Sequence, residues 1–269
     1  MTPIPKQRLD LLLVERGLAP SREAAQRLIL AGAVRAGDGG RKLTAGLRLP
    51  ADCELSVTAP EKYVSRGGLK LEHALDFFRI DPAGLTCLDV GASTGGFTDC
   101  LLQRGAEKII AVDVGRGQLA WRLRSDPRVQ LHEKINARNL PPELAAGAQL
   151  VVMDVSFISI TLIMPRLREL LPAIPVLSLI KPQFEAGRAM VGAGGIIRDP
   201  EVWRSVLESI AGRIAALGYD VQGPCKSPIE GGDGNREFFY LFQPGIGTPP
   251  AAEAIAAATG PATGKISGA

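Results

Sequence analysis

The chain contains 269 residues, of which 46% are hydrophobic and 22% are charged, and its formal net charge is +3. This much apolar material excludes a chain that is disordered throughout, and the length suits either one large domain or two unequal ones. The slight basic excess is compatible with a nucleic-acid partner but does not by itself identify one.

The first predicted unit covers residues 6–60. The stretch QRLDLLLVERG has leucines on one helical face and stops at Gly17, and Ser21 can cap a second helix, REAAQRLILAG, that ends at Gly32. Short apolar pieces broken by Gly, Asp and Pro follow, which is typical of small strands joined by turns. The sequence therefore predicts a small α+β domain built on a pair of helices.

Basic side chains are concentrated in this unit, and four of them are candidate RNA contacts: Arg8, Arg22, Arg27 and Arg35. A solvated, arginine-rich helical hairpin is the structural alternative. However, the run RLDLLLVERGLAPSREAAQRLILAGAV resembles the S4-like RNA-binding domain. The resemblance implies a basic face that lies on folded RNA and contacts mostly phosphates, which position a protein without reading bases.

A predicted linker occupies residues 61–68 and leads into the heptapeptide SRGGLKL. Its two glycines indicate a hinge or a place of close packing ahead of the helix LKLEHALDFF. Arg66 is a further candidate RNA contact, with a solvent-facing charge as the alternative. Lys70 alone would be an ordinary solvated lysine, so its role depends on charged residues elsewhere in the chain.

From residue 69 to residue 243 the pattern changes to alternating strands and helices. Runs rich in Val, Ile and Leu, such as GLTCLDVGA, KIIAVDVG, QLVVMDVSF and PVLSLIKPQ, are separated by helical stretches. This alternation predicts an α/β domain with a Rossmann-like, mainly parallel sheet that helices cover on both faces, and sites at the carboxyl ends of the strands. The final segment, residues 244–269, has almost no bulky side chains, so we expect it to be disordered.

A glycine-rich turn follows the first of these strands, in CLDVGASTGGFTD, and lets backbone approach a ligand closely. It matches neither the G-x-G-x-x-G fingerprint nor a P-loop. Asp113 ends the next strand, where a carboxylate can bind both hydroxyls of a cofactor ribose. Asp89 can anchor amides of the loop or meet a cationic amino acid group. Capping of a helix or loop is the structural alternative for both carboxylates.

The pattern D-V-G-x-x-x-G-G-F resembles the S-adenosylmethionine site of class I methyltransferases, and GASTGGFT is similar to that of the FtsJ-like ribose methyltransferases. The resemblance implies five residues beside the methionine end of the cofactor: Gly91, Ser93, Thr94, Gly95 and Phe97. It also implies Asp113 at the ribose and Asn136 at the adenine. A nicotinamide cofactor is the main alternative, and the missing third glycine of its fingerprint disfavours it.

Charged residues also stand at the ends of three apolar strands. Asp154 follows LVVM, Lys181 follows VLSLI, and Glu237 begins EFFYLF. Each alone would be a surface ion pair at a strand end, but a buried charge without a partner would be costly. Together with Lys70 they are a candidate catalytic set, because methyl transfer to a hydroxyl needs a base and orienting groups, and a neutral lysine can serve as the base.

Several motifs together resemble the TlyA family, whose members are bacterial 2'-O-methyltransferases of ribosomal RNA that often carry a haemolysin label. The motifs are SRGGLKL, VVMDVSFISI, LIKPQFE and NREFFYLF, combined with the S4-like front end. The resemblance implies cytidine riboses of large-subunit and in some cases small-subunit rRNA as substrates, and ribosomal subunits as partners. The family's K-D-K-E catalytic set falls on Lys70, Asp154, Lys181 and Glu237. The family's linker motif, R-x-W-V, is EKYV in this chain.

The mechanistic hypothesis assigns the four charged residues separate tasks. Lys181 acts as the base or near-base for the 2'-hydroxyl, and Asp154 aligns both groups. Lys70 and Glu237 complete the network. Glu185 is a rival carboxylate, and its position past the strand end favours a loop or substrate-facing role. Two alternative functions are a membrane-active haemolysin, which would need a spanning or amphipathic segment or export, and a catalytically silent RNA-binding protein.

The cysteines give no sign of a metal centre. Four cysteines occur without a C-x-x-C pair, and only two histidines could assist them, which argues against a zinc site and against a disulfide framework. The start of the chain, MTPIPKQRLD, lacks the apolar core of a signal peptide, and the most hydrophobic stretch is interrupted by Asp154. We therefore expect a cytoplasmic protein with no metal and no membrane anchor.

Overall fold

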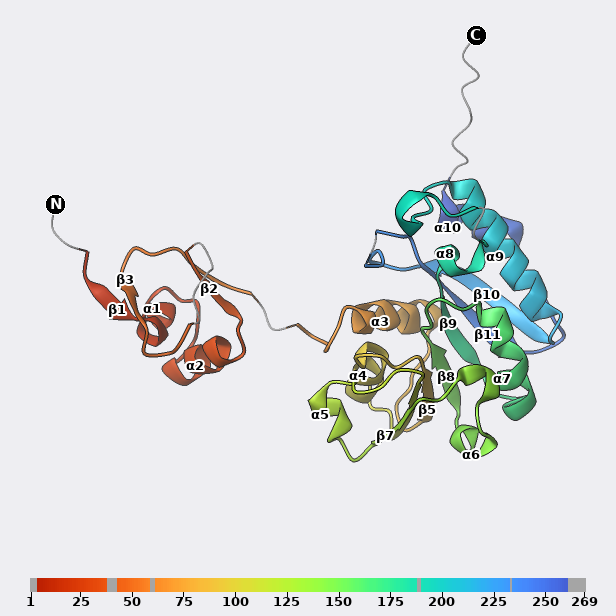
Figure 1. The fold of residues 1–269 in the computed structure, drawn as a ribbon, viewed down its shortest axis with the longest axis horizontal. Coiled ribbons are helices and arrows are strands. Elements are labelled where there is room, and N and C mark those ends of the chain that lie inside the picture. The colour runs from red at the N-terminus through yellow and green to blue at the C-terminus, as the bar shows by residue number, and fades with distance from the viewer. Residues whose placement is uncertain (1–3, 38–42, 59–60, 188–189, 233, 261–269) are drawn as a thin grey trace, which may run out of the picture. The chain divides into compact units, whose positions relative to one another are not determined.

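The computed structural model describes five ranges of the chain: residues 4–37, 43–58, 61–187, 190–232 and 234–260. The chain divides into two compact units, of which one ends at Lys62 and the other begins at Tyr63 (Figure 1). Each unit has a hydrophobic core of its own, as expected of segments that are separate domains.

The first unit is a small α+β domain. Its elements in chain order are β1 (Lys6–Arg8), α1 (Leu9–Glu15), α2 (Arg22–Leu30), β2 (Val34–Ala36), β3 (Arg48–Pro50) and β4 (Leu55–Val57). The Ser21 hydroxyl accepts a hydrogen bond from the amide of Ala24 at 3.2 Å, so the predicted helix cap is present. Buried side chains of both helices, among them Leu9, Leu13 and Ile29, form the core beside the antiparallel pairs β1–β3 and β2–β4.

A seven-stranded sheet forms the centre of the second unit. Its strands are β5 (Thr86–Val90), β6 (Lys108–Asp113), β7 (Val129–Glu133), β8 (Leu150–Met153), β9 (Val176–Ile180), β10 (Tyr219–Lys226) and β11 (Phe238–Pro244). They are ordered β10-β11-β9-β8-β5-β6-β7. β11 is antiparallel to both of its neighbours, and the strands from β9 to β7 are parallel. The predicted mainly parallel sheet is confirmed.

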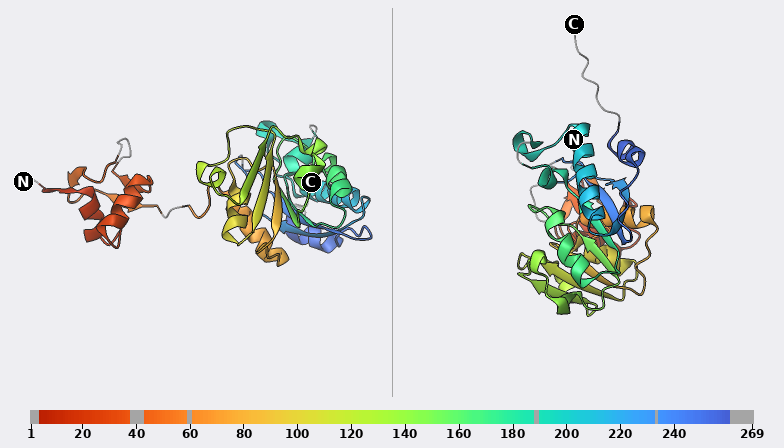
Figure 2. Two further views of the ribbon diagram at one scale, coloured as in Figure 1. Left: turned by 90° about the horizontal axis from the view of Figure 1, so that it is seen from below. Right: turned by 90° about the vertical axis from the view of Figure 1, so that its right-hand side faces the viewer.

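Helices cover both faces of this sheet (Figure 2). The α-helices are α3 (Gly67–Phe78), α4 (Gly96–Gln103), α5 (Trp121–Arg124), α6 (Pro142–Ala145), α7 (Met164–Leu170), α8 (Pro182–Glu185), α9 (Pro200–Ala215) and α10 (Ala252–Thr259). The short 3-10 helices are η1 (Ala137–Asn139), η2 (Ile160–Leu162) and η4 (Ala193–Gly195). Among the described residues, no helix has the length and apolar composition to cross a membrane.

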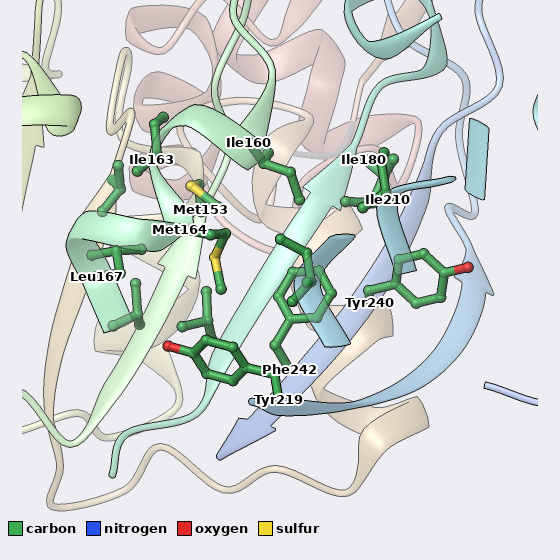
Figure 3. Packing of buried hydrophobic residues seen from close by; sticks show 14 of the residues in the cluster. Met153, Ile160, Ile163, Met164, Leu167, Ile180, Ile210, Tyr219, Tyr240 and Phe242 are labelled. Carbon is green, nitrogen blue, oxygen red and sulfur yellow. The ribbon is translucent and has the colours of Figure 1, made fainter. Parts of the chain in front are cut away.

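Two separate clusters of buried side chains hold the layers together. α3, α4 and α5 share one cluster with one face of the sheet, and α7 and α9 share another with the opposite face. Figure 3 shows part of the second cluster, in which Met164 and Leu167 of α7 and Ile210 of α9 pack with Tyr240 and Phe242 of β11. This packing on both faces gives the strand ends a rigid support.

The predicted linker at residues 61–68 differs from the observed connection. Tyr63 is buried in the core of the second unit, and α3 already begins at Gly67. A Cβ atom at Gly68 would lie 2.2 Å from Cγ of the Tyr63 ring. Of the two predicted roles for these glycines, hinge or close packing, Gly68 therefore serves close packing.

The prediction of a disordered C-terminal segment was wrong for part of its length. Residues Ala252–Thr259 form α10, which packs against α9 and β10 and buries Ile255 and Thr259. The small alanines let this helix approach a surface that the rest of the domain provides, so few bulky residues of its own are needed. The prediction from composition considered only the surface that this segment could bury by itself, without contacts to the rest of the domain. Residues 261–269 lie outside the described part of the chain.

Candidate active site

The charged strand-end residues come together because of the sheet topology. β8 and β9 are parallel, so Asp154 and Lys181 leave the sheet at the same edge. β11 runs antiparallel to β9, so Glu237, which directly precedes β11, lies at that edge as well. Lys70 belongs to the first turn of α3 and reaches Glu237 there. The four predicted catalytic residues therefore come from four separate segments to one edge of the sheet.

Asp154 and Lys181 form an ion pair, and the lysine also has one hydrogen-bond acceptor. Lys181 Nζ lies 2.5 Å from Asp154 Oδ1 and donates to Ser156 Oγ at 3.0 Å. The Lys181 and Asp154 side chains are only 13% and 22% exposed. Because a lysine stem is long and flexible, an ion pair and a hydrogen bond in a shielded place define the direction of its ammonium group.

Lys70 and Glu237 form a second and more deeply buried pair. Lys70 Nζ donates to Glu237 Oε2, and their side chains are 10% and 3% exposed. Burial raises the pKa of the Glu237 carboxyl, and the positive charges of Lys70 and Lys181 oppose this rise. The influence of Lys181 on Glu237 couples the two ion pairs. Gly231 leaves room for the carboxylate, since a Cβ there would lie 2.6 Å from Glu237 Oε1.

A pocket of about 460 Å³ opens where β5, β6 and β8 end. Its walls include four predicted cofactor residues, Gly91, Ser93, Asp113 and Asn136, and also Asp154. Both the volume and the mixture of apolar walls with a few polar groups are typical of sites for small molecules. The position, at the carboxyl ends of parallel strands, is where doubly wound sheets bind ligands.

Two glycines of the loop after β5 are required by the close approach of other segments. Gly91 has a φ of 87°, and a Cβ there would lie 2.3 Å from the carbonyl oxygen of Asp154. Gly95 has a φ of 99°, and a Cβ there would lie 2.3 Å from Cδ1 of Leu123. These backbone conformations favour glycine, and a side chain would collide in both places. Gly91 lines the pocket, whereas Gly95 packs against α5 instead.

The Asp113 carboxylate joins two backbone segments at the pocket. Its Oδ2 accepts from the Ser93 amide at 2.8 Å, and its Oδ1 accepts from the Gly115 amide at 2.6 Å. A carboxylate offers about four lone-pair positions, so acceptor capacity remains for the hydroxyls of a ligand. Asn136 uses its side-chain oxygen to accept from the Arg138 amide at 3.0 Å, while it forms part of the pocket wall.

Asp89 anchors the segment after the glycine-rich loop and does not line the pocket. It is fully buried in β5, and its Oδ2 accepts from the Thr98 hydroxyl of α4 at 2.6 Å. Its Oδ1 is buried with no hydrogen-bond partner within the described parts of the chain. Burial raises the pKa of the Asp89 carboxyl to about 7. Of the two roles predicted for this residue, the geometry favours anchoring over contact with a cationic ligand group.

A second hollow, of about 220 Å³, adjoins the pocket and shares Gly91, Ser93 and Asp154 with it. Its walls contain the other predicted residues of this region: Arg66, Lys70, Thr94 and Phe97. The Lys70 side chain therefore faces the space next to the pocket. Arg66 lines the same hollow.

The predicted RNA contacts of the first unit fall into two groups. Arg8 Nη2 and Arg22 Nε both donate to Asp10 Oδ2, at 2.8 and 3.0 Å. Asp10 is fully buried, and these bonds hold the pKa of its carboxyl well below the usual range. Arg8 and Arg22 thus stabilise the interior of the unit. Arg27 and Arg35 are exposed, as is Arg22, whereas Arg8 is half-buried.

Comparisons with known proteins agree with this geometry. The model of the FtsJ-like methyltransferase family matches residues 63–243, and that of the S4 domain matches residues 7–36. YqxC of Bacillus subtilis (strain 168) is 50% identical over 247 residues, which are 90% of this chain and 88% of its own. The 16S/23S rRNA (cytidine-2'-O)-methyltransferase TlyA of Mycobacterium tuberculosis (strain ATCC 25618 / H37Rv) is 45% identical over 242 residues, 88% of this chain and 90% of its own. A solved structure from Streptococcus thermophilus that carries a hemolysin name has a TM-score of 0.70 at 40% identity, and the match covers 95% of this chain and 96% of that one.

The sheet order, the pocket at the strand ends and the FtsJ-like match define a class I methyltransferase that carries an additional S4 domain. Within this class, the chain belongs to the TlyA family. The resemblances seen in the sequence, to the S4-like domain, to the FtsJ-like enzymes and to the TlyA family, are confirmed. Because the matches cover 88–95% of this chain, the family relation includes both units.

Proposed function

We propose that this protein transfers a methyl group from S-adenosylmethionine to the 2'-hydroxyl of a cytidine in ribosomal RNA. The observation that carries the proposal is the convergence of two coupled ion pairs, Lys70–Glu237 and Asp154–Lys181, beside the pocket at the strand ends. The name of the Mycobacterium tuberculosis relative states this activity for 16S and 23S rRNA, which supports the same substrate class for this chain.

The residues of the pocket fit S-adenosylmethionine. Asp113 offers a carboxylate for ribose hydroxyls at the end of β6, and Asn136 offers a polar group for the adenine. Gly91 and Ser93 expose loop backbone along which the methionine part can lie. When bound, the cofactor supplies an electrophilic methyl group on a positively charged sulfur.

The charged residues of the chain then prepare the ribose oxygen. A ribose hydroxyl is a weak nucleophile, so its proton must leave as the oxygen attacks. Lys181, once it has released its own proton, takes this one, while Asp154 and Ser156 hold the amine in line. A bound cofactor would supply the methyl group to this oxygen, and the proton would stay on Lys181 until solvent removes it. Lys70 and Glu237 supply fixed charges beside this pair.

Ribosomal RNA as substrate is supported by both units. The first unit matches the S4 domain and exposes Arg27 and Arg35. In the second unit, Arg66 lines the hollow beside the reacting groups. Phosphate contacts of this kind orient a strand without reading its bases, so the modified cytidine is selected by the fold of the RNA around it.

Mapping of 2'-O-methyl groups on rRNA from cells with and without this gene tests the proposal. We expect at least one cytidine to lose its methyl group in the absence of the gene and to regain it when isolated ribosomal subunits are incubated with the purified protein and S-adenosylmethionine. Identical maps, together with no transfer to isolated subunits, would contradict the proposal. Leakage from liposomes exposed to the purified protein would instead support the membrane-active alternative.

A further inference from the structure

One carboxylate near the catalytic set has no part in the mechanism described above. Glu185 ends α8, four positions after Lys181, and its Oε1 accepts a hydrogen bond from the amide of Ile160 at 2.9 Å. Burial raises the pKa of the Glu185 carboxyl, and its hydrogen bonds with Ser159 and Ile160 oppose that rise. Glu185 lines neither the pocket nor the adjoining hollow. Its contacts are therefore with the protein itself.

The bond from Ile160 to Glu185 is one of several contacts between two segments, the β8 loop (residues 154–160) and the β9 turn (residues 181–185). Lys181 bonds Asp154 and Ser156 at the beginning of both segments. The rings of Phe157 and Phe184 lie 4.8 Å apart between their centroids in the middle. At the far end, the Glu185 carboxylate accepts a hydrogen bond from the Ile160 amide and so joins the last residues of both segments. The two segments are thus held along their whole length.

The β8 loop has two tasks at once. Val155, Ser156, Phe157 and Ile158 form one wall of the pocket, and the same loop supplies the ion-pair partner and the hydrogen-bond acceptor of Lys181. A shift of the loop would move the pocket wall and the amine relative to each other. Misplacement of reacting groups by about 1 Å can lower a rate by about 10²-fold, so the far end of the loop matters although it is outside the site.

We propose that Glu185 is a positioning residue for methyl transfer, which holds the β8 loop in register with the β9 turn so that Lys181 and the pocket wall keep one fixed arrangement. This inference rests on the proposed function, because the arrangement it protects is the one that places the amine beside the methyl donor. It replaces the reading of Glu185 as a rival or substrate-facing carboxylate.

The test compares Glu185→Ala with Glu185→Gln in the full chain. The amide oxygen of glutamine can still accept from the Ile160 amide, whereas alanine cannot. The matched control is Asp220→Ala, because Asp220 Oδ1 accepts from the Thr248 amide at 2.8 Å in the same unit, near the opposite end of β11. Each variant is measured for melting temperature, for S-adenosylmethionine affinity by calorimetry without RNA, and for kcat on ribosomal subunits.

We expect Glu185→Ala to lower kcat by about 10- to 100-fold and to weaken cofactor binding several-fold, and Glu185→Gln to stay within about threefold of the original protein in both. Asp220→Ala should lose stability but keep kcat. The proposal is overturned if Glu185→Ala keeps kcat within about twofold, or if Asp220→Ala loses as much kcat as Glu185→Ala does at a similar melting temperature.

Two further measurements keep the test decisive. If Glu185→Ala does not fold, Glu185→Asp takes its place, because the aspartate side chain is one methylene shorter. In that case the proposal is overturned if Glu185→Asp has the same kcat as the original protein. It is also overturned if Glu185→Gln loses as much kcat as Glu185→Asp does. If the original protein methylates no ribosomal RNA, the proposed function has failed. The affinity for S-adenosylmethionine, measured by calorimetry, still tests whether Glu185 positions the pocket wall. An unchanged affinity in Glu185→Ala overturns the inference in that case.

Discussion

The Asp154–Lys181 pair differs from an ordinary surface ion pair in its surroundings. An exposed pair contributes about 0–1 kcal/mol to folding, since water screens both charges and the side chains lose freedom. This pair is shielded, Lys181 also donates to Ser156, and Asp154 and Ser156 lie in the pocket wall. Its value is therefore in the direction it gives to the amine, and catalysis should depend on it more than stability does.

A substitution of the catalytic lysine separates these two effects. Lys181→Met keeps a long side chain without the amine, so we expect kcat to fall by about 10²- to 10⁴-fold, which is the usual contribution of a positioned base. Cofactor affinity, measured by calorimetry, should change little, because the lost interaction belongs to the transition state. Lys108→Met is the control, because Lys108 begins β6 and so lies at the other end of that strand from the site. It should leave kcat unchanged. A Lys181→Met protein with normal kcat would refute the assignment.

The buried Asp89 predicts a pH dependence of stability. Its carboxyl has a pKa raised from 3.8 to about 7, so between these values the unfolded chain loses a proton that the folded protein keeps. Rising pH therefore lowers the free energy of unfolding, and above about pH 7 the loss is complete. Relative to Asp89→Asn, the original protein should lose about 2 kcal/mol between pH 5 and pH 7. Urea unfolding at both pH values measures this difference, and a constant difference would count against it.

The sequence predicted some residues of the site well and missed others for a physical reason. Asp154 and Lys181 were identified because a charge directly after an apolar strand is conspicuous. Ser156 was missed, because a serine in a loop has no pattern of its own and becomes an acceptor only when the loop turns toward Lys181. Asp10 was missed in the same way, since its partners Arg8 and Arg22 looked like surface charges until the fold buried the carboxylate between them.

At the scale of single elements, alternating patterns predicted β5 to β9 and β11 but not the strand directions, and they missed β10. Every parallel strand from β5 to β9 was recognisable as an apolar run. The reversal of β11 was not, because an apolar strand has the same composition whichever way it runs, and its neighbours decide the direction. Helix α10 was missed because its stability comes from contacts with α9 and β10.

Substitutions at two glycines can distinguish the cost of a strained backbone from the cost of a collision with a neighbouring atom. Gly91 and Gly84 both have positive φ angles, of 87° and 71°, but only at Gly91 would a Cβ meet another atom, the Asp154 carbonyl oxygen at 2.3 Å. Gly84→Ala should lower the free energy of unfolding by about 1–2 kcal/mol and leave cofactor affinity intact. Gly91→Ala should cost more and weaken cofactor binding by at least about tenfold, because the loop must move away from β8. Equal effects of both changes, by urea unfolding and calorimetry, would show that the collision is unimportant.

For the whole molecule, we expect the two units to divide the work of binding and chemistry. Exposed Arg27 and Arg35 should contact phosphates, so Arg27→Gln with Arg35→Gln should weaken binding to ribosomal subunits and reduce the salt slope of log affinity by about 2. The kcat at saturating subunits should not change. Arg8→Gln is the contrasting variant, and it should lower the melting temperature because it removes a partner of buried Asp10. A salt slope unaffected by the double substitution would argue that this face does not bind RNA.

The pairing of Lys70 with Glu237 also has a consequence for biosynthesis. The two residues are 167 positions apart, and the second directly precedes the last strand of the sheet. During translation, α3 and the parallel strands can assemble early, but the catalytic set stays incomplete until residue 237 has left the ribosomal exit tunnel. On the proposed function, we therefore expect that a nascent chain does not methylate the ribosome that is making it, and that a chain truncated before Glu237 has no methyl-transfer activity.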